Sequence, residues 1–118
     1  MRNIKYRGRK INSILWVTGN LAYINMDTDT CGIIVDNHAL HIVDLKSVGQ
    51  FTGLKDINDI EIYEGDLVER EDSFGDKYQA SEIVYEEDFG MFCFKDDAPN
   101  NLKLHHYNLE VIGKVYES

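Results

Sequence analysis

The chain has 118 residues, of which 43% are hydrophobic and 28% charged, and its 21 Asp and Glu against 12 Lys and Arg give a formal net charge of −9. This composition excludes a disordered chain and fits one domain or two small subdomains that share a core. The charge is uneven, because residues 1–47 carry a net +2 and residues 48–118 a net −11. Since an acidic protein repels phosphate groups, we expect no generic binding of nucleic acid.

The cysteines and the apolar runs bear on the cell compartment. Cys31 and Cys93 lie in apolar runs without Cys-x-x-Cys spacing, which indicates buried free thiols in a reducing compartment. No apolar run approaches the ~20 residues of a membrane span, and residues 11–17 are too short and too polar for the core of a signal peptide. We therefore expect a soluble cytoplasmic protein without a membrane partner.

The first ten residues are basic and contain no acidic residue. Ile4 and Tyr6 alternate with charged positions, a pattern that is typical of a charged edge strand or a solvated arm. The alternative is an arm that docks on an acidic surface, and the nearest such surface is this protein's own second half. The basic residues are Arg2, Lys5, Arg7, Arg9 and Lys10.

Four short apolar runs follow and predict two β-hairpins with turns around Gly19 and over residues 36–39. Asp44 then favours N-capping of a single helical turn at residues 45–47. The expected strands are Ile11–Val17, Leu21–Met26, Cys31–Val35 and Leu40–Val43.

The most patterned stretch of the chain covers residues 48–68. Gly49 and Gly53 predict a loop over residues 48–56, whose backbone either enters regions that a side chain would forbid or is closely approached by another segment. A turn at Asn58-Asp59 then leads into a strand over residues 60–64 with one buried face, which includes Ile60 and Ile62. A second tight corner at Gly65 leads into a strand at Leu67-Val68.

Further strands are expected beyond residue 68, separated by polar loops. Gly113 predicts a bulge or bend in the last strand, as the closure of a small barrel requires. No long apolar stripe with a 3.6-residue period occurs, so the predicted fold class is all-β. The expected strands are Ser81–Glu87, Met91–Lys95, Leu102–Tyr107 and Leu109–Tyr116, and the expected loops are Glu71–Gln79 and Asp96–Asn101.

Two blocks of the central stretch, V-G-Q-F-T-G-L-K-D at residues 48–56 and E-I-Y-E-G-D-L-V at residues 61–68, resemble the YopX family of phage and prophage proteins. The opening I-K-Y-R-G and the late E-V-I-G-K-V-Y-E also resemble that family, which usually has Asn-Gly where this chain has Asn58-Asp59. The resemblance implies an SH3-like small barrel, a phage-derived origin in a bacterial host cell and a function that is itself uncharacterised. We expect an N-terminal β-hairpin subdomain at residues 1–47, packed on a barrel at residues 48–118.

No motif of this chain completes a catalytic or metal site. The segment 27–32 begins like a calcium-binding loop, but Cys31 and His38 stand where that loop needs oxygen ligands. Zinc would need a turn to bring His38 and His41 to one ion together with Cys31. The acidic runs 69–72 and 86–88 are expected to be solvated faces. We therefore expect no enzyme activity, no cofactor and no bound metal.

The candidate interaction surface consists of polar residues in the central stretch and of the basic arm. For Thr52 and Asp56, the alternative is that they satisfy the backbone of turns. We expect a non-enzymatic accessory protein that binds an unknown phage or host protein or assembles into a homo-oligomer. The alternative is a nucleic-acid-binding module that uses the arm, with nearby aromatic residues for stacking. The candidate residues are Gln50, Thr52, Lys55, Asp56, Arg2, Lys5, Arg7, Arg9 and Lys10.

Overall fold

The computed structural model describes residues 4–36, 38–88, 90–95, 104 and 107–116. Regular structure in these residues is all β apart from short 3₁₀ segments, of which η1 is described in full, and this confirms the predicted fold class. No helix in this part of the chain is long and apolar enough to cross a membrane. The elements are β1 (Tyr6–Arg9), β2 (Trp16–Asn25), β3 (Thr30–Val35), β4 (Ala39–Asp44), η1 (Leu45–Ser47), β5 (Gly49–Lys55), β6 (Glu61–Tyr63), β7 (Asp66–Glu71), β8 (Lys77–Glu86), β9 (Met91–Phe94) and β10 (Asn108–Lys114).

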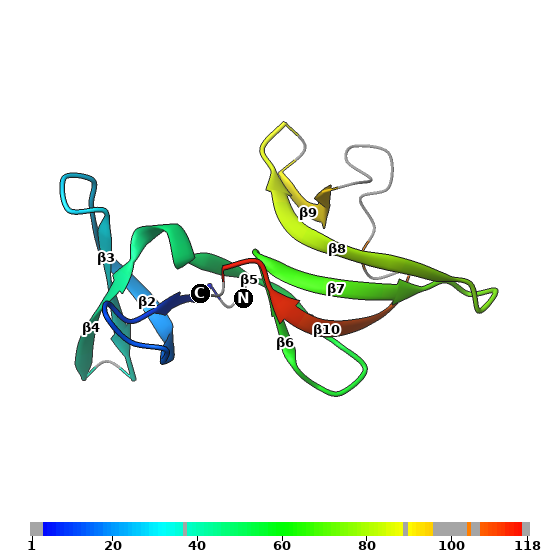
Figure 1. Ribbon diagram of the computed structural model, residues 1–118, viewed down its shortest axis with the longest axis horizontal. Helices are drawn as coiled ribbons and strands as arrows, with labels where there is room; N and C mark the ends of the chain where they lie inside the picture. Colours follow the sequence, from blue (N-terminus) through cyan, green and yellow to red (C-terminus); the bar gives the residue numbers. More distant parts are fainter. Residues whose placement is uncertain (1–3, 37, 89, 96–103, 105–106, 117–118) are drawn as a thin grey trace. The chain divides into compact units, whose positions relative to one another are not determined.

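The strands form two antiparallel sheets (Figure 1). One has six strands in the order β4-β3-β2-β1-β5-β6, and the other has four in the order β10-β7-β8-β9. Neither closes into a barrel within the described residues. The chain divides into two compact units, Met1–Phe51 and Thr52–Ser118, so β5 begins in the first unit and ends in the second.

The core of the first unit is small and comes from β3 and β4. Cys31, Ile33 and Val43 are fully buried there. β1 lies close to this core, because a Cβ added at Gly8 would sit 2.7 Å from the Val43 side chain and 3.1 Å from that of Ile33. The glycine therefore lets β1 pack where a side chain would not fit.

β1 is an inner strand, so the prediction of an edge strand or a solvated arm is wrong for this segment. It lies between β2 and β5, and Tyr6 pairs with Gly19 on one side and with Gln50 on the other. The alternating charges favour exposure, but the close approach of Gly8 to the core and the ladders on both sides bury this strand.

The predicted turn around Gly19 is also wrong, because β2 runs through this residue without a break. A Cβ at Gly19 would collide with the carbonyl group of Ile34 in β3, so the glycine marks a close backbone approach. The chain turns earlier, inside the segment that was expected to form the first strand. There the Lys10 N–H donates to the Leu15 carbonyl at 2.9 Å, and Asn12 has a φ of +55°.

The second predicted hairpin is confirmed as β3 and β4, and the predicted helical turn is confirmed as η1. Asp44 caps η1 by accepting a hydrogen bond from the Lys46 N–H at 3.2 Å. The Ser47 hydroxyl donates to the Asp44 carbonyl at 2.6 Å and accepts the Arg9 N–H at 2.8 Å. The connection between β4 and β5 is thereby attached to β1.

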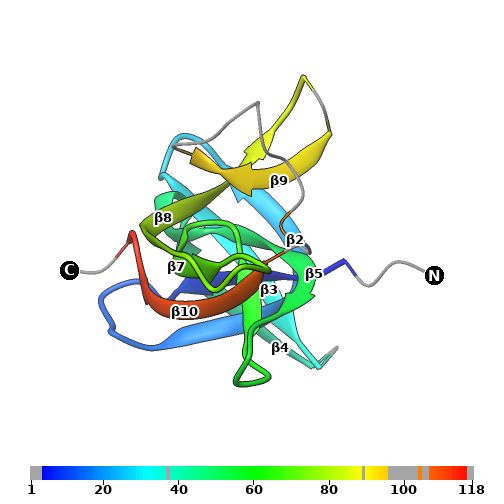
Figure 2. The ribbon, with the colours of Figure 1, turned by 90° about the vertical axis from the view of Figure 1, so that its right-hand side faces the viewer.

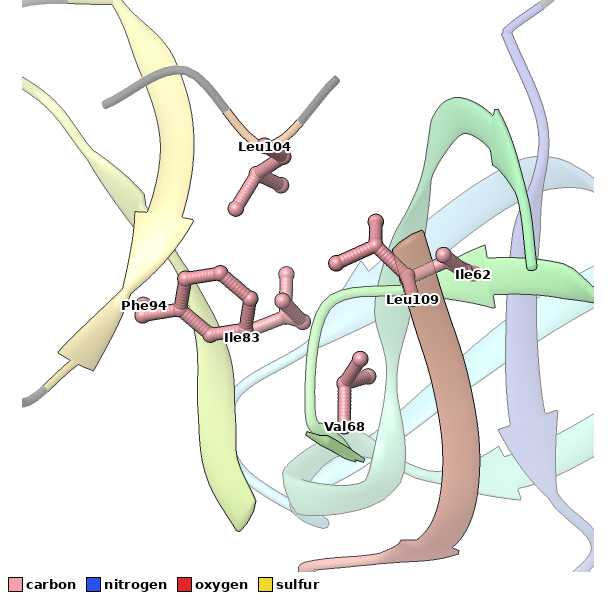
Figure 3. Packing of buried hydrophobic residues seen from close by; sticks show 6 residues of the cluster. All are labelled: Ile62, Val68, Ile83, Phe94, Leu104 and Leu109. Atoms are coloured by element: carbon pink, nitrogen blue, oxygen red, sulfur yellow. The ribbon is translucent and has the colours of Figure 1, made fainter. Parts of the chain in front are cut away.

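The core of the second unit collects side chains from β6, β7, β8, β9, β10 and the residue at position 104. β7, β8 and β10 lie side by side, and β9 follows on the far side of β8 (Figures 1 and 2). Cys93 is also fully buried, and it is a free thiol like Cys31 of the first unit, as predicted. The clustered side chains, which point toward one another in Figure 3, are Ile62, Val68, Ile83, Phe94, Leu104 and Leu109.

Three segment predictions need correction here. Residues 49–55 form β5 and are not a loop, because Gly49 and Gln50 pair with β1. The polar loop expected over residues 71–79 contracts to residues 72–76, because β7 and β8 extend the hairpin beyond the apolar core. Ile62 is fully buried, but Ile60 is 49% exposed and does not share its buried face. The strand expected at residues 102–107 and the loop expected at 96–101 lie largely outside the described residues.

The predicted special backbone is confirmed at Gly53, Gly65 and Asp59, whereas Gly49 is the first residue of β5 and has no positive φ. Gly53 and Gly65 have φ angles of +89° and +93°, and Asp59 has a φ of +66°. In β10 the pairing register shifts between Val111 and Gly113, which is the predicted bulge. These positions therefore depend on residues that tolerate a left-handed backbone or a local loss of pairing.

Candidate functional site

Thr52 and Asp56 are bound into the turn that follows β5. The Thr52 hydroxyl donates to a carbonyl oxygen of β6 at 2.8 Å. The Asp56 carboxylate accepts the backbone N–H groups of Asn58 at 2.8 Å, Ile60 at 2.9 Å and Val111 at 2.9 Å. Burial raises the pKa of Asp56, but these donors lower it by more, so the pKa lies below its ordinary value. The contacts support the turn-stabilising alternative for both residues.

Two basic residues of the arm lie against aromatic rings of the first unit. The Lys5 ammonium is 4.9 Å from the centre of the Phe51 ring, and the Arg7 guanidinium is 5.2 Å from that of Trp16. Arg7 is only 7% exposed. The Arg9 Nε donates to a carbonyl of the turn after β1 at 2.7 Å. These contacts stabilise the unit and leave little of Arg7 for an external ligand.

The remaining candidate residues belong to separate places in the chain. Gln50 pairs with β1 in the first unit. Lys55, in the second unit, forms an exposed ion pair with Asp59 at 3.5 Å. Lys10 forms a bridge with β4 and is half-buried, and Arg2 lies outside the described residues.

A shallow pocket of about 100 Å³ lies on the second unit and is lined by residues of β7, β8 and β10 and by Ile57. Glu69, Glu71 and Glu110 contribute to its lining, and the strand register places Glu69 directly opposite Glu110. Pockets for drug-sized ligands are larger, roughly 300–1,000 Å³. Among the residues that the structure describes, no group of three or more His, Cys, Asp or Glu is arranged to hold a metal ion.

The expectation that residues 69–72 form a solvated face is wrong for Arg70, which is only 8% exposed. Its guanidinium carbon lies 4.3 Å from the ring centre of Phe94, 4.7 Å from that of Tyr78 and 5.0 Å from that of Tyr107. Tyr107 meets both other rings edge to face. A cation that lies among three aromatic rings is attracted electrostatically by their negative faces. Arg70 therefore stabilises the packing of these rings at one end of the core of the second unit.

Exposed apolar side chains gather on the outer face of β2, β3 and β4. Tyr23 lies opposite Gly32, and Gly32 lies opposite Ile42, so all three share one face. A Cβ at Gly32 would collide with the Tyr23 ring and lie 3.0 Å from Leu40, so both side chains extend over this glycine. Tyr23 is 39%, Leu40 53% and Ile42 48% exposed.

A fourth apolar residue continues this row beyond the edge of β4. Because Lys10 pairs with Val43, the antiparallel register places Ile11 opposite Ile42 and on the same face. The Ile11 N–H donates to the Ile42 carbonyl at 3.1 Å, and the Ile11 side chain is 38% exposed. We call Ile11, Tyr23, Leu40 and Ile42 the apolar platform.

The second exposed feature is the tip of the β7–β8 hairpin, which extends away from the rest of its sheet (Figure 1). Phe74 at this tip is 89% exposed. Asp72 orders the loop, because its carboxylate accepts the N–H groups of Phe74 at 2.9 Å and Asp76 at 3.0 Å and the Tyr78 hydroxyl at 3.0 Å. Slight burial raises the pKa of Asp72, but these hydrogen bonds lower it overall. We call residues 72–76 the Phe74 loop.

The platform is hard to find from sequence because apolar strand residues are usually assigned to the core. One signal is available in β4, where Ile42 and Val43 are adjacent and therefore face opposite sides of the sheet. Val43 is fully buried and Ile42 is half exposed. A strand that is apolar on both faces, in a unit too small to bury both, is a sequence signal for an exposed apolar surface.

These features define a small all-β protein whose described surface carries an apolar platform and an ordered loop with an exposed aromatic tip. The chain belongs to the YopX protein family, whose model matches residues 5–118. A comparison with curated proteins finds no match.

Proposed function

We propose that this protein is a non-enzymatic accessory protein of a phage or prophage, which acts in the bacterial cytoplasm by binding protein through the apolar platform. The observation that carries the proposal is the joint exposure of Tyr23, Leu40 and Ile42 over Gly32. Contiguous exposed apolar side chains are typical of protein interaction sites, whereas single ones are ordinary surface.

The platform also has the properties of an energetic centre in an interface. Tyr23 lies on Gly32, and its position on a paired strand limits the conformations that binding would have to freeze. Aromatic residues in such positions contribute a large share of binding free energy, and flanking aliphatic residues exclude water. A partner with an apolar contact surface therefore fits this face.

An SH3-like arrangement of residues 48–118 remains part of the proposal, although neither sheet closes into a barrel within the described residues. In the second unit, the last strand β10 returns to pair with β7, and β8 and β9 follow in order. The first unit has the same kind of return, because β5 follows η1 and pairs with β1. Such folds carry many unrelated functions, so the proposal depends on the platform and not on the fold.

Capture of partners from phage-infected bacterial cells, with identification by mass spectrometry, tests the proposal. We expect the parent protein to retain a specific phage or host protein and the double variant Leu40→Ser/Ile42→Ser to lose it. Ile112→Ser is the matched control, because Ile112 is similarly exposed at 51% but lies in β10. Equal capture by the parent and the double variant would contradict the platform as the binding site.

The non-enzymatic part of the proposal has its own test. Purified protein supplied with divalent metal ions should not turn over nucleotides or nucleic acids, and turnover that follows the protein through purification would contradict this part.

Nucleic-acid binding through the basic arm is the competing function. The burial of Arg7 and the net charge of −9 argue against it. A titration of fluorescent single-stranded and duplex DNA at low salt should show no binding that weakens steeply as salt is added, and such salt-sensitive binding would favour the alternative.

A further inference from the structure

The Phe74 loop is built to present one aromatic side chain. A chain of hydrogen bonds fixes it: the Asp72 N–H donates to the Asp76 carbonyl at 3.0 Å, and the Gly75 N–H donates to the Asp72 carbonyl at 3.0 Å. Gly75 adopts a φ of +84°, which closes the loop in a conformation that other residues rarely adopt. An ordered loop loses little conformational freedom on binding, so its exposed ring is a pre-organised anchor.

We propose that the Phe74 loop of one copy of this chain docks on the apolar platform of a second copy. This inference rests on the proposed function, because it names what occupies the platform. The ring of Phe74, which is 89% exposed, would cover Tyr23, Leu40 and Ile42 of the second copy. Docking would then remove apolar area of both surfaces from water, which is the main favourable contribution to the free energy of such contacts.

The charges of the two units favour this pairing. Residues 1–51 contain six Lys or Arg and four Asp or Glu, whereas residues 52–118 contain six and 17, so the units carry +2 and −11. Asp72 and Asp76 stand next to the anchor, and Lys46 of the platform's unit keeps 75% of its side chain exposed while it forms a 3.8 Å ion pair with Asp29. Opposite charges on the two contact partners favour encounter and disfavour platform-to-platform pairing of two positive units.

Docking through side chains fits the edges of β4 and β10 better than strand addition does. β1 is an inner strand, and Ile11 donates to the outer edge of β4. On β10, the Leu109 carbonyl accepts the Ile57 N–H at 2.8 Å, and the Val111 N–H is bound by Asp56. These edges are therefore partly occupied within the chain, which is a common protection against strand addition.

The proposed contact joins different surfaces of two copies, so it is heterologous. Each copy then keeps one free loop or one free platform unless the assembly closes into a ring. A contact made by one loop and one sheet face is smaller than a standard interface, so we expect dissociation constants of roughly 10–100 μM.

Photo-crosslinking and analytical ultracentrifugation of the full chain test the inference together. With p-benzoylphenylalanine in place of Phe74, irradiation should link two copies, and the linked peptides should come from residues 11–44 of the second copy.

In analytical ultracentrifugation, the parent should sediment as concentration-dependent oligomers, and Phe74→Ser should raise the dissociation constant about tenfold or more. Ile57→Ser is the matched control, because Ile57 is 62% exposed in the same unit and should leave the constant unchanged.

Two substitutions of opposite charge at the platform test the electrostatic part of the inference. Ile42→Asp places a negative charge against Asp72 and Asp76 and should weaken association more than Ile42→Lys does. We expect each variant to fold, because every substituted side chain is exposed. Thermal melts of each variant check this.

A parent that stays monomeric at ~500 μM, well above the expected dissociation constant, would overturn the inference. Crosslinks confined to residues of the second unit would also overturn it. Neither result affects capture of a phage or host protein by the platform, so failure of the docking and failure of the proposed function give different outcomes.

Discussion

The Asp56 carboxylate accepts the backbone N–H of Val111 at 2.9 Å, and this hydrogen bond joins residues that are 55 positions apart in the chain. The same carboxylate holds the turn between β5 and β6 through Asn58 and Ile60. One side chain thus closes a local turn and attaches the last strand of the second unit to it. Because Asp56 is only 8% exposed, water cannot readily replace these bonds.

Asp56→Asn should lower the free energy of unfolding by about 1.5–3 kcal/mol, the range for buried hydrogen bonds to a charged group. An amide has one oxygen and one NH₂ group, so it cannot accept hydrogen bonds on both sides. Urea denaturation measures the loss. Asp59→Asn is the control, because the Asp59 side chain is 84% exposed and its ion pair is weak. Equal unfolding midpoints for the two variants would show that the carboxylate is not needed.

The contribution of the Asp56 carboxylate should also appear in the pH dependence of stability. The pKa of Asp56 is lowered in the folded protein, since its backbone hydrogen bonds outweigh the effect of burial. Its contribution is therefore fully present above the unfolded-state pKa and is lost as pH falls through the lower folded-state pKa. Unfolding free energies measured at several acidic pH values should fall less steeply for Asp56→Asn than for the parent. Identical acid slopes would refute the linkage.

Local backbone demands could be predicted from the sequence, and long-range pairing could not. Gly53, Gly65 and Asp59 are residues that tolerate positive φ, so their turns follow from chemistry within a few positions. Gly19 shows the limit. A glycine between two apolar runs fits a turn or a close backbone approach equally well, and only the carbonyl of Ile34 decides between them.

The residue types of the candidate site could be predicted better than the positions of its residues in the fold. Polar residues of the central stretch are indeed bound at a turn, because short polar side chains satisfy nearby backbone groups. The burial of Arg70 depends on Tyr78, Phe94 and Tyr107, which reach it from other strands and a later turn. Because its neighbours in the sequence are acidic, the sequence alone does not indicate that Arg70 is buried among aromatic rings.

Gly53 allows a strain effect to be separated from a packing effect. Its φ is +89°, and a Cβ there would meet nothing within 4 Å, so the cost of a side chain is conformational alone. Gly53→Val should lower the free energy of unfolding by about 1–3 kcal/mol. Gly53→Asn should cost less, because Asn tolerates a left-handed backbone. Thermal melts compare the variants with the parent, and an unchanged Val variant would contradict the strain.

Arg70→Lys should destabilise the protein although it keeps the charge. Guanidinium is planar and can face several rings, whereas an ammonium group is compact and strongly hydrated, so it loses more on burial. With Phe94, Tyr78 and Tyr107 all within 5.0 Å of the guanidinium carbon, we expect a loss of about 1–3 kcal/mol. Guanidinium chloride denaturation gives the free energy, and near-UV circular dichroism reports the packing of the rings. Lys77→Arg exchanges the same residue types in the reverse sense at an exposed site in β8 and should change neither signal. If the two variants unfolded at the same denaturant concentration, Arg70 would act only as a positive charge, and its contacts with the three rings would contribute nothing measurable.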